Sequence, residues 1–364
     1  MNKKQIAVAA LLVCVLLFAA YKLLYPKNYV SVMAVTGATP LALTGEVQRG
    51  TTLEVSGMTK RVYSFNKNAL DAFAATYIRT REVAPDGKFL GTYRYTGIPV
   101  LHILEGIAPK KPESAAFERP LDMLVTFVGE NGATANFSYG ELTMTDDSNP
   151  VILAFDRKEL TPTEAKKKEA YTANVYHENV KGLRLVCPAE PDTVRYLDDV
   201  KKIVLTTPDV PYKELPAATK GAKCSSDTVV CLWGGKKAEI KFAGVARDSI
   251  KNWVRTGHGQ GFKGIADAKG YNLVSALEKN FPGCGPDNYF LFVACDGYRA
   301  LFSGRELFLT DDGRRAMIIT ELNGKTPSGG MTLGPVRDYY VDRDVWGLAY
   351  IAVLDAVSPA GQDK

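Results

Sequence analysis

Histidine is scarce in this chain of 364 residues, and its three copies, His102, His177 and His258, lie far apart. Zinc sites need closely spaced cysteines or grouped histidines, and neither a CxxC nor a CxxCH motif occurs. A zinc site and a covalently attached c-type haem are therefore not expected. No Ser/His/Asp or Cys/His order typical of nucleophilic hydrolases is present, so the sequence predicts no metal site and no catalytic residue.

Long runs of one charge sign are also missing. The chain carries 45 basic and 40 acidic residues, and the short basic run 166–168 stands between Glu164 and Glu169. Nucleic-acid-binding domains usually concentrate basic residues on one surface, so no nucleic-acid partner is expected. The hydrophobic share of 46% and the charged share of 23% are typical of globular domains.

One long apolar run is present, near the N-terminus. It has no charge, proline or glycine from Ile6 to Ala20, and it extends to Tyr25 if Lys22 reaches the interface. About 20 apolar residues cross a bilayer, and the lysines before the run favour a cytoplasmic N-terminus. We therefore expect residues 1–27 to form a membrane anchor of a single-pass protein whose domains are extracytoplasmic, in the periplasm or at the cell exterior. A cleaved signal peptide is the alternative.

Four cysteines form two groups that are close in sequence, and they suit an oxidising compartment. Their spacing suggests two local disulfides, Cys224–Cys231 and Cys284–Cys295. A metal site is the competing interpretation of these residues.

The chain repeats itself. FSYGELTMTDD at 137–147 recurs as FSGRELFLTDD at 302–312, with seven of eleven residues identical at an offset of 165. Other blocks match in the same order, which indicates an old duplication with altered loops. These blocks are LEVSG (53–57) with IKFAG (240–244), GIPVLHILE (97–105) with GYNLVSALE (270–278), and RYLDDVKKIVL (195–205) with RDVWGLAYIAV (343–353).

In each copy the pattern predicts a strand, a helix, a loop, a short helix (97–105 and 270–278), a hairpin that leads into the repeated phrase, a mixed tail and a final strand. The expected fold class is therefore α+β. The expected segments are a linker at 28–50, a first module at 51–206, a second linker at 207–236 and a second module at 237–364.

The acidic residues of the repeated phrase could bind a cation or act as acid and base. We instead expect the paired aspartates, at 146–147 and 311–312, to form Asx-type turns. Glu141 and Glu306 are expected at the surface or in turn hydrogen bonds.

Two segments of the first copy carry a family resemblance. YRYTGIPVLHILEGI (93–107) resembles the aromatic-x-Gly-hydrophobic-Pro-Leu segment of the sulfite-oxidase-like, molybdopterin-binding oxidoreductase domain. KGLRLVCPAEPDTVRYLDDVKKIVL (181–205) resembles that family's Gly-x-x-Leu-Arg-Leu-Val-x-Pro segment. The resemblance covers roughly 155 residues of the first copy and the second copy more weakly. It implies two tandem sulfite-oxidase-like modules.

Active members of that family bind molybdenum through one cysteine, which precedes the aromatic-Gly-Pro segment. The corresponding segments here, 76–97 and 254–270, contain no cysteine, and threonine or arginine cannot replace a thiolate as a soft ligand. The resemblance therefore implies the fold, whereas the molybdenum site is expected to be lost. No cofactor is predicted, and molybdopterin held by other contacts is the alternative.

Arginine and threonine stand in both copies where the family places its cysteine, each pair after a short run expected to be helical. Guanidinium groups there could bind an anionic ligand, or form salt bridges at helix ends. The segment RTGHGQGFKG (255–264) could bind an anion through free glycine amides, or be a flexible surface loop. Arg184 could face solvent or a ligand cleft. The ligand-binding candidates are Arg79, Thr80, Arg184, Arg255, Thr256, His258 and Lys263.

Taken together, these features predict a membrane-anchored, extracytoplasmic binding or accessory protein. Its expected partners are an anionic small molecule and a membrane redox or assembly system. A molybdopterin-dependent oxidoreductase without the cysteine thiolate is the first alternative, and a purely structural tandem domain is the second.

Overall fold

The structure is a computed structural model that describes residues 46–146, 148–161, 176–219, 224–257, 259 and 261–355. Residues Gly45–Lys364 form one compact unit. Within it we call the described residues up to 206 the first half and those from 224 onward the second half. The domain boundaries expected from the sequence stay predictions.

The expected α+β class is wrong, because the described chain is mostly sheet, with 45% of residues in strands and 14% in helices. Two runs expected as helices contribute to the error. Of the first run, at 69–78, only the start belongs to helix α2 (Lys67–Asp71), and its end enters strand β3 (Thr76–Val83). The second run, at 249–254, lies inside strand β12 (Arg247–Gly257). Buried and exposed residues alternate along β3 and the end of β12, which is the period of a strand.

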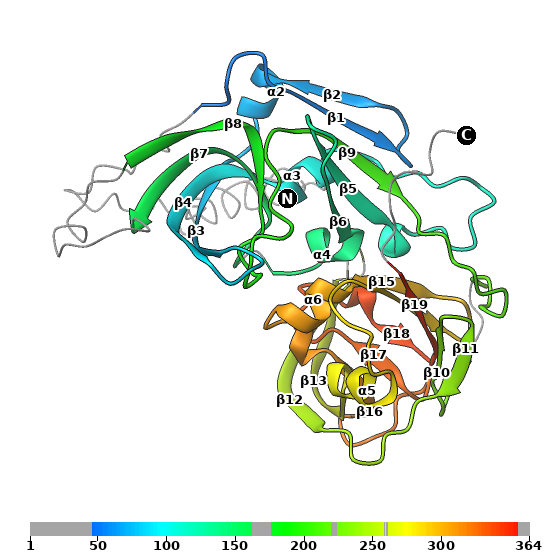
Figure 1. The fold of residues 1–364 in the computed structure, drawn as a ribbon. Coiled ribbons are helices and arrows are strands. Elements are labelled where there is room, and N and C mark those ends of the chain that lie inside the picture. Colours follow the sequence, from blue (N-terminus) through cyan, green and yellow to red (C-terminus); the bar gives the residue numbers. More distant parts are fainter. Residues whose placement is uncertain are drawn as a thin grey trace, which may run out of the picture. The chain divides into compact units, whose positions relative to one another are not determined.

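Four sheets contain these strands, two in each half (Figure 1). One sheet of each half has the same strand order, β2-β1-β9-β5-β6 in the first and β11-β10-β19-β14-β15 in the second. In both, the first and last strands of the half pair in parallel, β1 with β9 and β10 with β19. The strands are β1 (Thr52–Gly57), β2 (Tyr63–Asn66), β5 (Leu124–Gly129), β6 (Thr134–Ser138), β9 (Val200–Thr206), β10 (Val230–Trp233), β11 (Lys236–Glu239), β14 (Tyr289–Ala294), β15 (Arg299–Ser303) and β19 (Leu348–Leu354).

The other sheet of each half starts at its edge with a long antiparallel pair, β3 with β4 or β12 with β13. Its order is β3-β4-β7-β8 in the first half and β12-β13-β16-β17-β18 in the second. The remaining strands are β4 (Phe89–Pro99), β7 (Ile152–Thr161), β8 (Tyr176–Val186), β13 (Gly261–Asn272), β16 (Met317–Leu322), β17 (Thr332–Gly334) and β18 (Val345–Trp346).

The helices of the described residues are short. Helices α3 (Val100–Glu105) and α5 (Leu273–Asn280) confirm the helices expected at 97–105 and 270–278. Helix α4 (Tyr139–Thr143) follows β6, and α6 (Gly304–Leu309) follows β15. Three 3-10 turns complete the set, η1 (Pro120–Asp122), η3 (Gly313–Arg315) and η4 (Val341–Arg343).

Each half has its own hydrophobic core, and the hairpins expected before the repeated phrase are confirmed as β5/β6 and β14/β15. The rings of Phe127 and Phe137 pack edge to face at 5.5 Å, and those of Phe292 and Phe302 do so at 5.3 Å. Because both pairs differ by the same offset of 165, the aromatic centre of the core is itself repeated.

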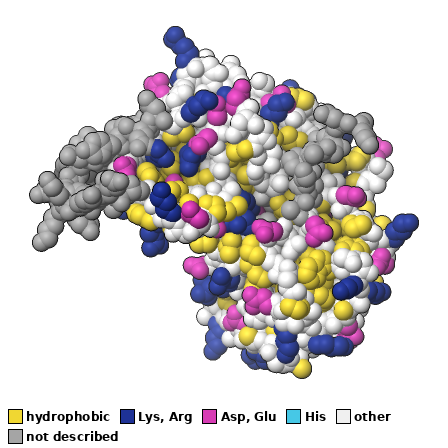
Figure 2. Space-filling view, in the orientation of Figure 1, with side chains coloured by type: hydrophobic (Ala, Val, Ile, Leu, Met, Phe, Trp, Pro, Cys, Tyr) yellow, Lys and Arg dark blue, Asp and Glu magenta, His cyan; other side chains and the backbone are white. Residues whose placement is uncertain are grey.

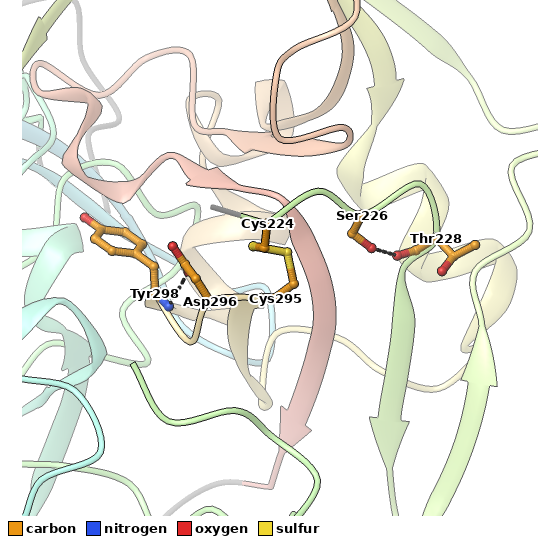
Figure 3. The surroundings of a disulfide bond; sticks show 6 residues. All are labelled: Cys224, Ser226, Thr228, Cys295, Asp296 and Tyr298. Atoms are coloured by element: carbon orange, nitrogen blue, oxygen red, sulfur yellow. Dashed lines mark hydrogen bonds between the residues drawn. A yellow bond between two sulfur atoms is a disulfide. The ribbon is translucent and has the colours of Figure 1, made fainter. Parts of the chain in front are cut away.

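A disulfide joins Cys224, before β10, to Cys295, after β14 (Figure 3). The local pairings Cys224–Cys231 and Cys284–Cys295 are therefore wrong. Cys231 and Cys284 are free and buried in the core of the second half. Adjacency along the sequence was a poor guide, because the bond spans 71 residues that the fold brings together.

No helix of the described residues is both long and apolar enough to cross a membrane. The expectation of membrane attachment through an N-terminal helix, and of the extracytoplasmic location derived from it, therefore has no support in the structure and stands corrected. The segment 1–27, where the anchor was expected, lies outside the described residues.

Candidate ligand-binding site

The two Arg-Thr pairs point in opposite directions. Arg79 is exposed on β3, and Thr80 is buried with its Oγ1 donating a hydrogen bond to Glu82 Oε1 at 3.2 Å. Arg255 is instead buried on β12, and it donates to Asp344 Oδ2 at 3.1 Å. A shift of one residue reverses the face of a strand, so the correspondence expected between the pairs does not hold.

The glycine-rich segment 255–264 forms the end of the β12/β13 hairpin, where Arg255 faces Gly264 and Gly257 faces Gly261. Thr256 is half-buried and Lys263 is exposed. His258 lies outside the described residues. The described part of this segment is therefore a paired β-hairpin, not the open anion-binding loop that was considered.

Arg184 lies on β8 among acidic side chains. It forms an ion pair with Asp198, and its Nη2 lies 3.8 Å from Glu82 Oε2. Its guanidinium also lies 5.6 Å from the ring centre of Tyr196. None of the described candidate residues lines the cavity of about 840 Å³ that is described below.

The repeated phrase forms a strand-to-helix turn in each half. Ser138 caps α4, because its Oγ accepts a hydrogen bond from the Glu141 backbone N at 3.0 Å while the Glu141 carboxylate accepts one from the Ser138 backbone N at 3.3 Å. Ser303 caps α6, because its Oγ accepts a hydrogen bond from the Glu306 backbone N at 3.0 Å. The Ser-x-x-Glu spacing is a capping signature, so the local reason for the repeat is the start of a helix.

The two turns also bind each other, at the junction of the halves where Figure 1 shows α4 and α6. Ser303 Oγ donates to Glu141 Oε2 at 2.9 Å, and Ser138 Oγ donates to Glu306 Oε2 at 3.3 Å. Both glutamates are buried, so of the two placements expected for them the surface is wrong. The turn hydrogen bond is confirmed for Glu141, whose carboxylate accepts from the Ser138 backbone N. Each is covered by the opposite half, which lies more than 160 residues away in sequence.

Each glutamate has a buried arginine partner from its own half. Arg195 pairs with Glu141 and Glu190, and its guanidinium lies 3.8 Å from the ring centre of Phe137. Arg343 pairs with Glu306 at 2.6 Å, and its guanidinium lies 4.2 Å from the ring centre of Phe302. The repeat therefore builds the same group twice: an aromatic ring, an arginine above it and the capping glutamate.

Two further contacts complete this network. Arg343 makes a two-pronged ion pair with Asp338, with both nitrogen–oxygen distances at 2.6 Å. Arg305 of α6 reaches the first half, where its Nε donates to Glu190 Oε2 at 2.6 Å and its Nη2 pairs with Asp192.

Carboxylates outnumber guanidiniums in the network. Burial raises the pKa of Glu306 to about 8 and that of Asp338 to about 6, in each case against the opposing attraction of Arg343. A single arginine shared by two buried carboxylates does not hold both fully ionised. The acidic members are Glu141, Glu190, Asp192, Glu306 and Asp338, and the basic members are Arg195, Arg305 and Arg343.

A cavity of about 840 Å³ opens against this network. The two copies of the phrase contribute corresponding residues to its wall, and the network contributes most of its charged members. From the first copy come Glu141, Leu142, Thr145 and Asp146, and from the second come Glu306, Leu307, Thr310 and Asp311. The volume lies in the range of small-molecule sites, about 300–1,000 Å³.

The rim of the cavity contains the Thr-Asp-Asp turns. Asp146 Oδ1 accepts a hydrogen bond from the Ser148 backbone N at 2.8 Å, so the Asx-type turn expected there is confirmed, while Asp147 lies outside the described residues. Burial, followed by the neighbouring charge of Asp146, raises the pKa of Asp312. Its Oδ1 lies 4.0 Å from Arg337 Nε. The turns thus carry carboxylates of both copies to one rim.

Cys187, just after β8, also lines the cavity. Burial raises the pKa of its thiol well above the ordinary value, and the charge of Glu190 adds to the effect. The thiol therefore favours its neutral form. Among the described residues, no group of three or more His, Cys, Asp or Glu side chains is placed to hold a metal ion.

The sequence contained a signal for part of this site. The Ser-x-x-Glu capping motif could have placed the helix starts, and the match of RYLDDV with RDVWGL aligned Arg195 with Arg343. Nothing in the sequence indicated that the two turns face each other. On the face shown in Figure 2, basic and acidic side chains are interspersed.

Comparison with known proteins shows no family for this chain. No family model and no curated protein matches the chain. Among solved structures, the sulfane dehydrogenase SoxCD from Paracoccus pantotrophus is a weak neighbour, with 12% sequence identity and a TM-score of 0.31 over 85% of this chain and 78% of that chain.

Proposed function

We propose that this protein binds a small molecule in the cavity between its two halves. The observation that carries the proposal is the cavity of about 840 Å³, whose wall is built from corresponding residues of both copies of the repeated phrase. A packed junction with a purely structural role would fill such a space, because protein interiors are close-packed. The charged wall is rigid, since its side chains are held by ion pairs and helix caps, and it is thus organised before a ligand arrives.

We also propose that the chain is a tandem of two diverged sulfite-oxidase-like modules without molybdenum chemistry. The segments in which that family carries its thiolate lie mostly in the β3/β4 and β12/β13 strand pairs and contain no cysteine. Cys187 does not substitute for it by position, because it follows β8 and lies in neither of these strand pairs.

The test uses the purified full chain and a library of small molecules of differing charge, with thermal unfolding as the readout. A ligand is expected to raise the Tm, and Ala189→Trp should abolish that rise because Ala189 is exposed and lines the cavity. Ala243→Trp is the matched control, because Ala243 is exposed and does not line it. Ligand effects that persist in Ala189→Trp, or none across the library, would contradict the proposal. Stoichiometric molybdenum by metal analysis would contradict the second part.

A further inference from the structure

The charge of the cavity wall differs from that of the whole protein. The chain has a net charge of +5, yet eight carboxylates and five guanidiniums line the cavity. The acidic residues are Glu141, Asp146, Glu190, Asp248, Glu306, Asp311, Asp312 and Asp338, and the basic residues are Arg195, Arg314, Arg315, Arg337 and Arg343. A basic protein that encloses an acidic cavity selects against anions there and attracts cations.

The excess of carboxylates is greatest in the buried part of the wall. There Arg195 pairs with both Glu141 and Glu190, Arg343 pairs with both Glu306 and Asp338, and Arg305 pairs with Glu190 and Asp192. Three guanidiniums thus face five carboxylates. Burying a charge without a counter-charge is costly, so the surplus must be met by protons or by a cation. The rim adds four carboxylates against three guanidiniums, a smaller surplus, and Arg337 Nε lies 4.0 Å from Asp312 Oδ1.

We infer that the cavity binds a polyamine, a flexible organic cation with several amino groups. Its ammonium groups form ion pairs with the surplus carboxylates of the buried wall and of the rim. The inference rests on the proposed function, because it assigns a ligand class to the same cavity. An alkylammonium group offers three donors and no acceptor, which suits a wall rich in carboxylate oxygens. The volume of the cavity is far larger than a bare metal ion needs, and a chain of methylene groups can follow the apolar side chains of Leu142 and Leu307.

Binding of an ammonium group has a second consequence at Glu306. Its raised pKa of about 8 leaves the side chain largely protonated at pH 7. An ammonium group beside it favours the ionised form, so Glu306 gives up its proton to the solvent as the ligand binds. A polyamine therefore replaces a proton as the counter-charge, and this exchange can be measured directly.

The probe is spermidine, titrated into the full chain by isothermal calorimetry at pH 7 in two buffers of different ionisation enthalpy. We expect saturable binding, with release of up to one proton per spermidine. Glu306→Gln, which imitates the protonated carboxyl, should lower the affinity at least tenfold and remove the proton release. Asp311→Asn at the rim should weaken binding without changing the proton count. Asp227→Asn is the control, because Asp227 is exposed, does not line the cavity and should leave both quantities unchanged.

The outcomes distinguish a failure of the polyamine assignment from a failure of the proposed ligand-binding function. Citrate and sucrose serve as anionic and neutral comparison probes. If either binds in a manner blocked by Ala189→Trp while spermidine does not, the polyamine assignment is wrong and the ligand-binding function stands. Spermidine binding that survives Ala189→Trp places the cation elsewhere and overturns the inference. Thermal unfolding of Glu306→Gln confirms that the variant is folded before its affinity is compared.

Discussion

The second residue of the helix in each repeated turn is glycine in one half and arginine in the other. At Gly140 in α4, an added Cβ would lie 2.3 Å from Cδ of Arg343, so the missing side chain makes room for the arginine of the opposite half. At the corresponding position in α6, Arg305 reaches into the first half and binds Glu190 and Asp192. The junction is therefore not a symmetric pairing of two copies. At this helix position the first half receives a side chain and the second half supplies one.

Removal of Arg343, the side chain that the first half accommodates at Gly140, should cause the largest loss of stability. Arg343→Met would leave Glu306 and Asp338 buried without their cation, and loss of one partner of a buried ion pair typically costs about 3–5 kcal/mol. Urea unfolding of the full chain measures the loss. Arg119→Met is the control, because Arg119 is half exposed and its Nη1 lies 3.7 Å from Asp342 Oδ1, a surface pair worth roughly 1 kcal/mol or less. Equal effects of the two substitutions would show that the buried network is not a major source of stability.

A smaller loss of stability is expected when the space at Gly140, which accommodates Arg343, is filled. Gly140→Ala places a Cβ against Arg343, and overpacking of this kind costs about 1–3 kcal/mol. Gly285→Ala is the matched control, since no atom lies within 4 Å of its Cβ position. Both variants are compared by thermal and urea unfolding. A Gly140→Ala protein as stable as the control would mean that Arg343 can move aside freely.

The smallest effect, per pH unit, is expected in the pH dependence of stability. The pKa of Glu306 is raised from 4.5 to about 8, so between these values the folded state binds a proton that the unfolded state does not. The contribution of Glu306 to stability is therefore lost as the pH rises from about 5 to 8, at roughly 1 kcal/mol per pH unit. Urea unfolding at pH 5.5, 6.5 and 7.5 measures this slope, and Glu306→Gln should flatten it. An unchanged slope in that variant would assign the pH dependence to other groups, of which Asp344, with a pKa raised by burial to about 7, comes first.

The sequence predicted the repeat, the helices α3 and α5 and both hairpins, because these depend on local patterns such as a glycine before an apolar helix face. It failed for β12, whose apolar residues suit a helix and a strand equally well over so few residues. It also failed for the disulfide, because sequence spacing does not reveal which distant segments the fold brings together.

The site was missed for a related reason. Glu141 and Glu306 are charged residues in short turns, and in isolation such residues belong at the surface. Their burial depends on Arg195 and Arg343 and on the opposite serine, none of which is a near neighbour in sequence. Arg79 and Arg255 were chosen because they stand in both copies where the resembling family carries its cysteine, and the structure places them on separate strands away from the cavity.

The crossed bonds between Ser303 and Glu141 and between Ser138 and Glu306 bear on how this protein can be dissected. A fragment cut between the halves would present a capping glutamate and its arginine to water without the serine of the opposite half, and would uncover apolar residues such as Leu124 and Leu291 that pack across the junction. Such a fragment should aggregate or unfold even though its own sheets are intact. The smallest piece suitable for expression and crystallisation therefore runs through both copies of the repeat, and insertions or tags belong at its ends rather than between them.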